Sequence, residues 1–474
     1  MKIPLSEHKT ISIAYREEAQ SEIDGCTIYI DDLSLFNSFK ALESQRFNSS
    51  SFKYIVEKSE NEIKLSSDYC VGIDWLGATN RFVYVEPKVN TSDTYRFENL
   101  INETDENINY IYSSEIVELN FLKMLLEVHS GKIYDKYLQD LVSIDWNSKQ
   151  IPIEQNQDHL TPFLIVEFLQ LLKRIVIKGL KKTYYKTNEN LTNRVKGKIL
   201  VAQQIKQNTL KGRLTKTLCQ YQVFGEDNSE NRFLKKVLSF VTNYVQNNKP
   251  LFHENIESVQ HLISYSRPSF ENIGTEFEAF ELKHIKPNPF FKEYAQAIKI
   301  GQYILKRFSY NISKTTDKKI TTPPFWIDMP RLFELYVYHH LLISNENAKD
   351  RILYQFATYG NSLDFLIKDD DNPMIIDTKY KLHYENGHIH QDIRQVSGYA
   401  RLNKVRDELG ITDDSNINCL IIYPDPKGLD LSNSKLEIDS LISESERIEP
   451  YYKVFKLGVK LPLQSMKTQT GTLS

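Results

Sequence analysis

Apolar and polar residues alternate over most of the first ninety residues, and this period of two predicts a series of short β-strands. Polar turns such as KSEN and GATN separate the strands, as is typical of hairpins. The carboxylates and His8 of this part are scattered over turns and strand edges, so a role in interaction is favoured over catalysis. Strands are expected at residues 10–15, 27–30, 53–57, 62–66, 71–76 and 81–85.

Further along, apolar residues recur at spacings of three and four, which predicts amphipathic helices. Helices are expected at residues 117–131, 163–180 and 231–247, and Gly131 and Gly179 provide stop signals for the first two. The stretch NRVKGKILVAQQIKQNTLKGRLTK, between the last two helices, is predicted to be a basic loop because glycines and charges interrupt its apolar positions. This middle part should be mainly helical.

The last third of the chain mixes both periods. Residues 464–474 lack either period and are expected to be a frayed tail. The order predicted before that tail is a helix at 330–342, a strand at 352–357, two hairpin strands at 362–367 and 374–380, a helix at 392–409 and a strand at 418–423.

These patterns predict a multidomain α+β protein. A β-rich N-terminal domain with a helical extension should span residues 1–155, and a mainly helical, basic middle domain should span residues 156–311. The order of helix, strands, helix and strand in residues 312–474 predicts a C-terminal α/β domain. A polar segment ending at Pro323-Pro324 is a reasonable hinge before that domain.

Composition narrows the class of protein. The 474 residues are 41% hydrophobic and 12% aromatic, which is typical of a globular chain with substantial cores. Four widely spaced cysteines with no CxxC pair indicate neither a zinc ribbon nor a disulfide scaffold. The most apolar stretch, 163–180, is interrupted by four charged residues, so no membrane span is expected. A cytoplasmic protein fits these features best.

Charge is distributed unevenly behind a net value of −3. Residues 165–216 hold thirteen Lys and Arg and two acids, a local excess of +11 that leaves −14 for the rest. Such an excess is typical of a surface that binds a polyanion, although a solvated helix face is the plain alternative. The candidates for contacts with DNA phosphates, which would give affinity without base specificity, are Arg194, Lys196, Lys198, Lys211 and Arg213.

Phosphate-binding loops for nucleotides are absent from the sequence. The dipeptides Gly131-Lys132 and Gly197-Lys198 are not followed by Ser or Thr, so there is no Walker A motif. The chain itself is therefore not expected to bind a nucleoside triphosphate in that way.

The strongest chemical signal lies in the predicted hairpin SLDFLIKDDDNPMIIDTKYK. Asp364 is in the middle of the first strand, and Asp377 and Lys379 lie two positions apart on the second, so they project from one face. Carboxylates within apolar strands are costly unless they are paired or bind a cation. Oxygen ligands of this kind suit Mg²⁺. A salt bridge between Asp364 and Lys379 in an inactive hairpin is the alternative.

Context distinguishes this tripeptide from others of the same form. Asp377-Thr-Lys379 ends an apolar strand and follows a helix that carries Glu334, a candidate for a further ligand, although a Glu on an amphipathic helix usually faces solvent. On the helix downstream, Gln395 and Tyr399 share a face because they are four residues apart. The same tripeptide form, without this context, occurs at Glu7-His-Lys9, Glu62-Ile-Lys64, Glu86-Pro-Lys88, Glu281-Leu-Lys283, Asp317-Lys-Lys319 and Asp425-Pro-Lys427.

Asp364 followed by Asp377-Thr-Lys379 resembles the signature of the PD-(D/E)xK nucleases, and Gln395-Val-Ser-Gly-Tyr399 resembles the QxxxY element of their RecB and lambda-exonuclease branch. This resemblance implies that the two acids bind Mg²⁺ and that the lysine positions or polarises the attacking water. The cation would polarise the phosphoryl oxygen. Leu363 stands where the family has its proline, a position that supplies no metal ligand.

Several stretches together resemble the McrC subunit of McrBC restriction systems, which depend on DNA modification. They are VGIDWLGATNRFVYVEPKV, NRVKGKI, DNSENRFLKK, DMPRLFELYV, SLDFLI, IIDTKYK and DIRQVSGYARL.

The resemblance to McrC implies a Mg²⁺-dependent DNA endonuclease subunit of an anti-phage defence system. The N-terminal module would bind a ring of a separate AAA+ GTPase of the McrB type, stimulate its hydrolysis and be directed onto DNA by it. The alternative is an adaptor that activates a ring AAA+ NTPase and uses an inactive nuclease fold only to bind DNA.

Overall fold

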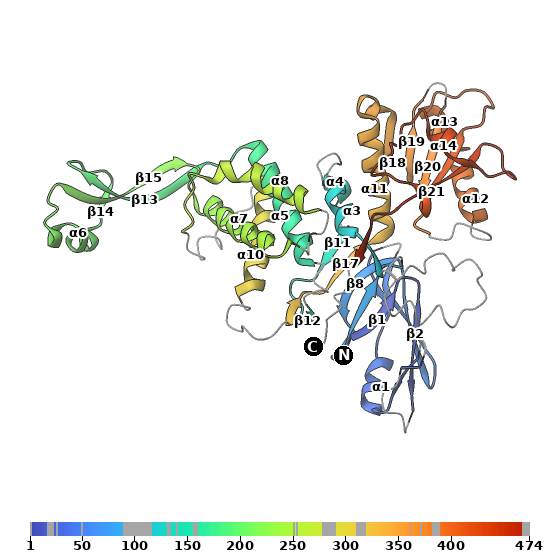
Figure 1. Cartoon of the computed structure of the whole chain (residues 1–474), viewed down its shortest axis with the longest axis horizontal. Coiled ribbons are helices and arrows are strands. Elements are labelled where there is room, and N and C mark those ends of the chain that lie inside the picture. Colours follow the sequence, from blue (N-terminus) through green and yellow to red (C-terminus); the bar gives the residue numbers. More distant parts are fainter. Residues whose placement is uncertain are drawn as a thin grey trace, which may run out of the picture. The chain divides into compact units, whose positions relative to one another are not determined.

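A computed structural model gives the fold of residues 2–16, 23–24, 27–48, 51–88, 116–129, 133, 135–138, 141–154, 160–249, 252, 255–276, 291–309, 319–360, 362–369, 372–381 and 389–466. The chain divides into two compact units (Figure 1). Unit 1 combines Met1–Pro152 with Thr321–Ser474, and unit 2 is Ile153–Ile320. The ends of the chain thus belong to one unit, and the middle forms the other.

A six-stranded sheet organises the N-terminal part of unit 1. Side chains of successive strand residues point to opposite faces, so the alternating apolar positions, such as Ile13 and Ile63, form a buried face. Helix α1 (Leu33–Lys40) adds Phe36 and Phe39 to the same core. In the order β3-β4-β2-β7-β6-β5, the strands are Ile23–Asp24, Thr27–Ile30, Thr10–Tyr15, Glu62–Ser67, Phe52–Lys58 and Gln45–Arg46.

A five-stranded sheet joins the two ends of the chain. Its strand β17 comes from the C-terminal part, yet it pairs with β8 and β11, and Trp326 on it is buried in the N-terminal core. Gly72 faces Trp326 in the ladder, and a Cβ there would lie 2.1 Å from the Phe325 carbonyl oxygen. In the order β1-β9-β8-β17-β11, the strands are Lys2–Ser6, Phe82–Glu86, Cys70–Trp75, Phe325–Asp328 and Val142–Ile144.

The C-terminal sheet of unit 1 has six strands, and its centre is parallel: β20 pairs with β21, and β21 with β23. Residues Met374 to Asp377 of β20 are buried on both faces, as expected for a parallel strand covered by helices. In the order β18-β19-β20-β21-β23-β22, the strands are Ile352–Ala357, Ser362–Ile367, Met374–Thr378, Asn418–Leu429, Val454–Val459 and Glu446–Arg447.

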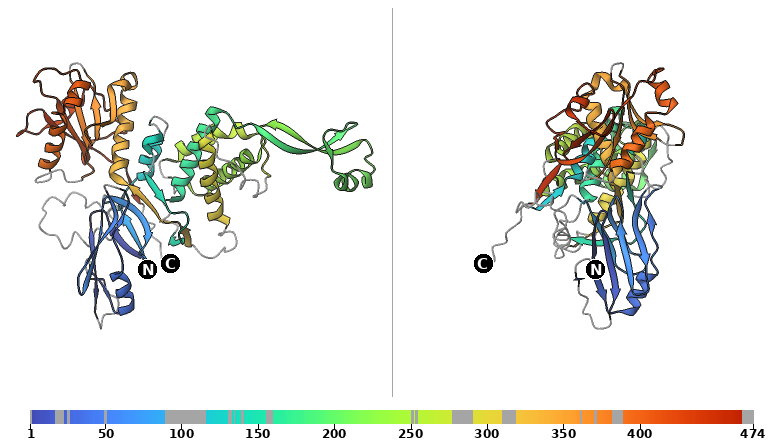
Figure 2. Two further views of the ribbon diagram at one scale, coloured as in Figure 1. Left: turned by 180° about the vertical axis from the view of Figure 1, so that it is seen from behind. Right: turned by 90° about the vertical axis from the view of Figure 1, so that its right-hand side faces the viewer.

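Helices lie against this sheet (Figure 2). Helix α11 (Met329–Ser344) contacts β20, and its Tyr338 ring lies 5.7 Å from the Phe365 ring of β19. Helix α12 (Ile389–Tyr399) contacts β20 and β21. The smaller elements of unit 1 and its edges are β10 (Ile116–Leu119), α3 (Phe121–Val128), α4 (Asp135–Leu138), β12 (Ile151–Glu154), β16 (Lys319–Thr322), η7 (Glu346–Arg351), α13 (Asn403–Glu408), α14 (Leu441–Glu444) and β24 (Leu463–Met466).

Unit 2 is a group of helices with a long arm. Helix α5 packs against α8 and α10, and α10 also packs against α7. The arm is an antiparallel ribbon of β13 and β15 that runs out from the helices and ends in a small tip (Figures 1 and 2). The helices are α5 (Leu160–Lys178), α7 (Ser229–Asn247), α8 (Ile256–Ser266), η5 (Arg267–Phe270) and α10 (Lys292–Ser309). The arm contains β13 (Thr183–Thr192), β14 (Lys198–Ile199), α6 (Val201–Gln207), η3 (Thr209–Lys211) and β15 (Lys216–Gly225).

The mixed α+β class is confirmed, as are the six N-terminal strands, the hairpin of β19 and β20, and helices α5, α7 and α11. The prediction of a loop at 193–216 is wrong, because β14, α6 and η3 lie within it and form the tip of the arm. The helix predicted at 117–131 is also wrong at its start, since Ile116–Leu119 pairs with β24 and the helix begins at Phe121.

Two C-terminal predictions need correction as well. The helix expected at 392–409 is two helices, α12 and α13, and α12 ends at Tyr399, one residue after Gly398, which has low helix propensity. Residues 464–466 of the expected tail belong to β24 instead, while residues 467–474 lie outside the described part. Of the polar hinge, residues 319–322 form β16, and 312–318 also lie outside the described residues.

No helix in the described ranges combines the length and the apolar character that crossing a membrane requires.

Candidate functional site

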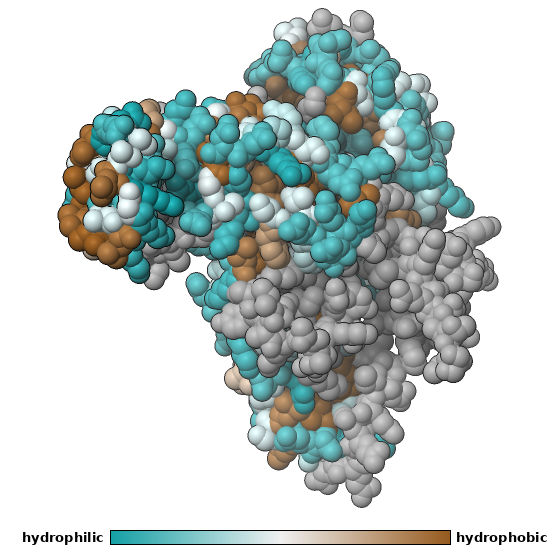
Figure 3. Space-filling model, turned by 60° about the vertical axis from the view of Figure 1, so that its left-hand side comes forward, coloured by the Kyte–Doolittle hydropathy of each residue, from teal (hydrophilic) through white to brown (hydrophobic). Residues whose placement is uncertain are grey.

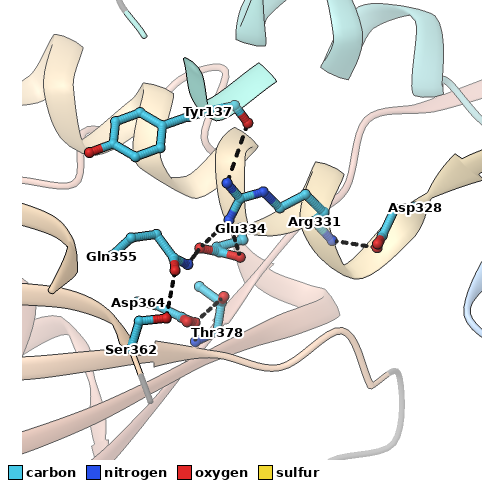
Figure 4. A network of polar contacts seen from close by, with 8 residues as sticks. All are labelled: Tyr137, Asp328, Arg331, Glu334, Gln355, Ser362, Asp364 and Thr378. Atoms are coloured by element: carbon cyan, nitrogen blue, oxygen red, sulfur yellow. Dashed lines mark hydrogen bonds and ion pairs between the residues drawn. The ribbon is translucent and has the colours of Figure 1, made fainter. Parts of the chain in front are cut away.

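The site is built from the first turn of helix α11. The Asp328 carboxylate accepts a hydrogen bond of 3.0 Å from the Arg331 amide and so caps the helix, and Pro330 occupies its first turn. Glu334 lies one turn beyond Arg331. The Arg331 Nη1 atom lies 3.1 and 3.2 Å from the two Glu334 carboxylate oxygens, and its Nη2 atom donates to the Tyr137 carbonyl (Figure 4).

Gln355 on β18 supports Glu334 from the sheet. Its amide nitrogen donates to Glu334, and its amide oxygen accepts a 2.8 Å hydrogen bond from Ser362 (Figure 4). The backbone of Gln355 has φ of +52°, a left-handed conformation that is rare within a strand and costs about 1–3 kcal/mol. Gln355 was not among the predicted site residues, and the one signal for it in the sequence is an amide in the apolar strand ILYQFA.

Asp364 and Asp377 lie on the neighbouring strands β19 and β20, whose ladder ends at the pair Phe365 and Ile376. Asp364 directly precedes Phe365, and Asp377 directly follows Ile376. One oxygen of Asp364, Oδ2, accepts hydrogen bonds of 2.7 Å from both the amide and the hydroxyl of Thr378. Thr378, the middle residue of the Asp-Thr-Lys tripeptide, therefore fixes the orientation of the first acid, as Figure 4 shows.

Asp377 is almost completely buried, with 2% of its surface exposed. Its Oδ2 atom lies 2.7 Å from the Lys379 ammonium, as expected for residues that project from the same face of a strand. Apart from this ion pair, Oδ2 has no polar partner within the described part of the chain. The alternative ion pair between Asp364 and Lys379 is not the one found.

The three acids share an excess of negative charge. Burial, and then the neighbouring Asp364 charge, raise the pKa of Glu334 to about 7 and that of Asp377 to about 7. Burial also raises the pKa of Asp364, although the two Thr378 hydrogen bonds oppose it. Acids that raise one another's pKa are stabilised when a cation binds among them.

Lys379 connects this group of acids to helix α12. Burial favours its neutral form, but Asp377, Asp364 and Asp392 outweigh that effect and raise its pKa, so it is a cation at neutral pH. Its ammonium donates a 3.0 Å hydrogen bond to the Gln395 amide oxygen, and the Gln395 amide nitrogen donates to the Tyr399 hydroxyl at 3.0 Å. The structure thus brings the QxxxY pair to the lysine.

The carboxylates of the site are ligands that suit Mg²⁺, but they do not by themselves complete its coordination. Within the described residues, no three His, Cys, Asp or Glu side chains are arranged to hold a metal ion. Mg²⁺ is usually held by one or two carboxylates together with waters and substrate phosphates. Asp364 and Asp377 supply two carboxylates, and Oδ2 of Asp377 has the Lys379 ammonium as its one close polar partner within the described residues. Both oxygens of Glu334 are engaged by Arg331.

Other candidates are not assembled in this way. In the tripeptide Asp425-Pro-Lys427, the aspartate accepts from the Lys427 amide at 2.8 Å, which is a local turn. The His390 ring contacts the Tyr451 hydroxyl at 2.8 Å, and His388, its partner in the sequence pattern, lies outside the described residues. The buried His340 ring lies 3.0 Å from Glu127.

All five residues predicted to bind DNA lie at the tip of the arm and are exposed. They share that tip with large apolar side chains that are also exposed, for example Leu210 at 77% and Leu214 at 83% (Figure 3). An exposed apolar cluster is unusual on a protein surface and marks a contact with another molecule. The exposed apolar residues of the tip are Val195, Ile199, Val201, Ile205, Leu210 and Leu214.

Polar groups hold the tip together from within. Asn208 is fully buried, and it exchanges two side-chain hydrogen bonds of 2.8 and 2.9 Å with Asn190 on β13. Gln204 accepts from Asn208 and from the Leu218 amide, both at 2.7 Å. The tip therefore keeps its shape although Leu210 and Leu214 remain exposed.

Residues of the motif DNSENRFLKK hold the root of the arm. Asn228 and Asn231, at the start of helix α7, both donate to the Lys181 carbonyl just before β13, at 2.8 and 3.0 Å. Asn231 also accepts a 2.7 Å hydrogen bond from Tyr294, and Glu230 forms an ion pair of 2.6 Å with the Lys181 ammonium. These buried contacts fix the direction of the arm relative to its helices.

The described chain is thus a mixed α+β protein with acids and a lysine gathered where two interior strands of the C-terminal sheet, β19 and β20, stop pairing. The family model of the McrBC 5-methylcytosine restriction system component matches residues 70–411, well over half of the chain, and the chain belongs to this family. The predicted resemblance to this family is therefore confirmed.

Solved structures similar to the chain come from Thermococcus gammatolerans. A refined half-complex from a tetradecameric assembly of McrB AAA+ hexamers with bound McrC is 17% identical, with a TM-score of 0.36, covering 97% of this chain and 94% of that chain. A cryo-EM structure of the McrBC complex is 18% identical, with a TM-score of 0.27, covering 76% and 89%. A search of curated proteins found no match.

Proposed function

We propose that the chain is a Mg²⁺-dependent DNA endonuclease subunit that works with an AAA+ GTPase of the McrB type, whose hydrolysis it stimulates. The observation that supports this function best is that Asp364, Asp377 and Lys379 lie together with Gln395 and Tyr399 beside the ends of strands β19 and β20. Membership of a 5-methylcytosine restriction family supports DNA as the substrate.

In this proposal, Asp364 and Asp377 hold Mg²⁺, which when bound polarises the phosphoryl oxygen of the DNA backbone. Lys379 is a cation whose ammonium lies beside Asp377, so it stabilises the negative charge that develops on the phosphate or orients the attacking water. Gln395 and Tyr399 hold the lysine side chain in place. Glu334 helps to set the charge of the site and stays bound to Arg331.

The test is a cleavage assay on plasmid DNA that carries 5-methylcytosine, with the AAA+ partner, GTP and Mg²⁺. Wild-type protein should cut the plasmid, and chelation of the metal should stop it. The Asp377→Ala variant should not cut, although its circular dichroism spectrum and its binding to the partner should be unchanged. Cleavage by that variant at the wild-type rate would refute the proposal.

A second candidate function is an adaptor that activates a ring NTPase without cutting DNA. Two observations favour it: no three acidic, His or Cys side chains of the described chain form a metal cage, and the arm tip exposes apolar side chains suited to a protein partner. Sequence reasoning assigns partner binding to residues 1–155, and the tip provides another surface for it. If the chain is an adaptor, the wild-type protein and the Asp377→Ala variant should stimulate GTP hydrolysis equally, and neither should cut DNA.

A further inference from the structure

A polar cluster connects the N-terminal strands with the segment after β20 that contains Lys379. Strands β1 and β9 are parallel neighbours, and each is followed by a charged residue: Glu7 after β1 and Lys88 after β9. Both residues reach Tyr380, which follows Lys379 directly. The cluster is therefore made of Glu7, Lys88 and Tyr380, from two parts of the sequence almost 300 residues apart.

The contacts within the cluster are specific. The Lys88 ammonium donates a 2.6 Å hydrogen bond to the Tyr380 carbonyl oxygen and lies 3.9 Å from the centre of the Tyr380 ring. The Glu7 carboxylate accepts from the Lys88 amide at 3.0 Å and from the Tyr380 hydroxyl at 3.3 Å. Lys88 therefore binds the main chain of the hairpin end, and Glu7 orients both partners.

This position bears on the candidate active site because of how Lys379 is attached. On one side, the Lys379 amide donates to the Ile422 carbonyl at 2.9 Å and so remains in the sheet. Beyond it, the chain turns, with the Lys381 amide donating to the Lys379 carbonyl at 2.8 Å. The hydrogen bond from Lys88 to Tyr380 is thus an anchor on the turning side of Lys379.

Stability alone is a poor reason to keep this cluster. The Tyr380 and Glu7 side chains are buried, and the Glu7 Oε1 atom finds no hydrogen-bond partner in the described part of the chain. Lys88 is half-buried, and the loss of solvation lowers the pKa of its ammonium to about 8. Replacing buried charges with apolar groups of similar volume is often neutral or stabilising. A costly arrangement beside a candidate site is more typical of a functional than of a stabilising role.

We infer that Lys88 is a positioning residue of the nuclease site: by binding the Tyr380 carbonyl it holds the turn that aims Lys379 at Asp377, and Glu7 orients it. This inference rests on the proposed nuclease function. It also gives the N-terminal strands a part in catalysis, in addition to any part in binding a partner.

The decisive variant is Lys88→Met, which keeps the apolar stem but loses the ammonium. The turnover number for cleavage of methylated plasmid should fall at least tenfold, while the KM for DNA and the melting temperature stay near wild type. Lys88→Arg, which keeps a cationic donor, should recover part of the loss. Hydrogen exchange of peptides covering residues 374–381 should become faster in Lys88→Met, because the turn has lost its anchor.

The matched control is Lys149→Met. The Lys149 ammonium also lies over an aromatic ring, 5.1 Å from the centre of Trp75, and donates one hydrogen bond, to Asn80, but Lys149 has no contact with the hairpin among those described. This control should change neither turnover nor exchange at 374–381.

The outcomes separate the two proposals. A wild-type protein that never cuts DNA would overturn the nuclease function, whereas the exchange experiment would still report on the anchor. If wild type cuts and Lys88→Met has wild-type turnover and exchange, the positioning role is wrong. It is equally wrong if turnover falls only in proportion to the fraction of unfolded protein, without rescue by Lys88→Arg.

Discussion

The candidate active site and the tip of the arm are opposites in how they arrange polar and apolar groups. At the site, three carboxylates and a lysine are enclosed by apolar strands and by helix α11, and they alter one another's pKa. At the tip, a buried Asn208 and its partners form the inside, while leucines face outward. Enclosed charges suit a cation and chemistry on a phosphate, whereas outward leucines suit a protein surface.

This comparison also bears on which partner the basic segment at 165–216 binds. The charge excess at 165–216 suggested DNA phosphates as the target, but its five candidate residues stand among exposed apolar side chains at the tip. A phosphate backbone offers little to an exposed leucine, whereas a protein groove offers much. Substitutions at the two places should therefore affect different measurements.

The largest effect is expected from Asp364→Asn, which keeps the volume of the side chain but removes its charge. Loss of several kcal/mol of transition-state stabilisation should reduce cleavage on the order of 1,000-fold. Plasmid cleavage with the partner, GTP and Mg²⁺ measures this. Asp425→Asn, in the tripeptide of the same form on β21, is the matched control and should cut like wild type. Equal loss in both variants would mean that the context of the hairpin does not define the site.

The next largest effect should come from the double variant Leu210→Ser and Leu214→Ser at the tip. If both leucines are buried by the partner, about 3 kcal/mol is lost and the Kd rises about 100-fold. Binding of the AAA+ partner measures this, and the melting temperature should not change. Tyr452→Ser, at an exposed apolar side chain outside both the N-terminal part and the arm, is the control.

The charges of the tip provide the opposing test. Lys198→Ala and Lys211→Ala should then weaken partner binding less than the leucine variant does. If they instead weaken DNA binding and reduce its salt dependence, while the leucine variant binds its partner normally, the tip is a DNA surface.

A smaller effect follows from the raised pKa values of Glu334 and Asp377, both about 7 against ordinary values of 4.5 and 3.8. The Asp377 proton must leave before Mg²⁺ binds there, so the affinity for Mg²⁺ should fall about tenfold per pH unit below about 7. Calorimetric titration of Mg²⁺ at several pH values measures this.

Linkage fixes the sign of the corresponding change in stability. Because the folded-state pKa values are above the unfolded ones, the stabilisation is complete below the unfolded values and is lost as pH rises through about 7. Thermal melts in EDTA should therefore show a decline from pH 5 to pH 8. Asp377→Asn should flatten that decline in part, since Glu7 and Glu167 have pKa values raised to about 7 as well. A slope identical to wild type would contradict the assignment to Asp377.

The smallest effect is expected from Tyr399→Phe, which removes only the hydroxyl that accepts from Gln395. Loss of one half-exposed hydrogen bond costs about 1 kcal/mol, so turnover should fall about fivefold. Gln395→Ala should reduce it further, because Gln395 contacts the Lys379 ammonium directly. The reverse order of these two variants would show that Tyr399 contacts the substrate itself.

The sequence was informative where burial imposes a pattern. Strands β2, β7 and β20 bury one or both faces, so their apolar positions alone revealed them. The pairing of Asp377 with Lys379, and the face shared by Gln395 and Tyr399, followed from the geometry of a strand and a helix.

The arm was not predicted because it lacks such burial. A two-stranded ribbon buries little, and the tip is held by amides such as Asn208 and Gln204 rather than by a core, so no apolar period marks it. Gln355 and Lys88 were missed because their partners are distant in sequence: the first supports Glu334, and the second reaches Tyr380. Contacts of this kind depend on tertiary structure, which local periodicity does not record.

The position of β17 has a consequence for dissecting this protein. A gene fragment that encodes only residues 312–474 would produce β17 without β8 and β11, its neighbours on both sides, and would expose Trp326. We expect such a fragment to aggregate. Deleting residues 1–90 to test partner binding would remove β8 and Lys88 together, and so would confound a loss of recognition with a loss of folding. Cutting the chain within unit 2 and co-expressing the halves is the division that keeps every strand of the five-stranded sheet.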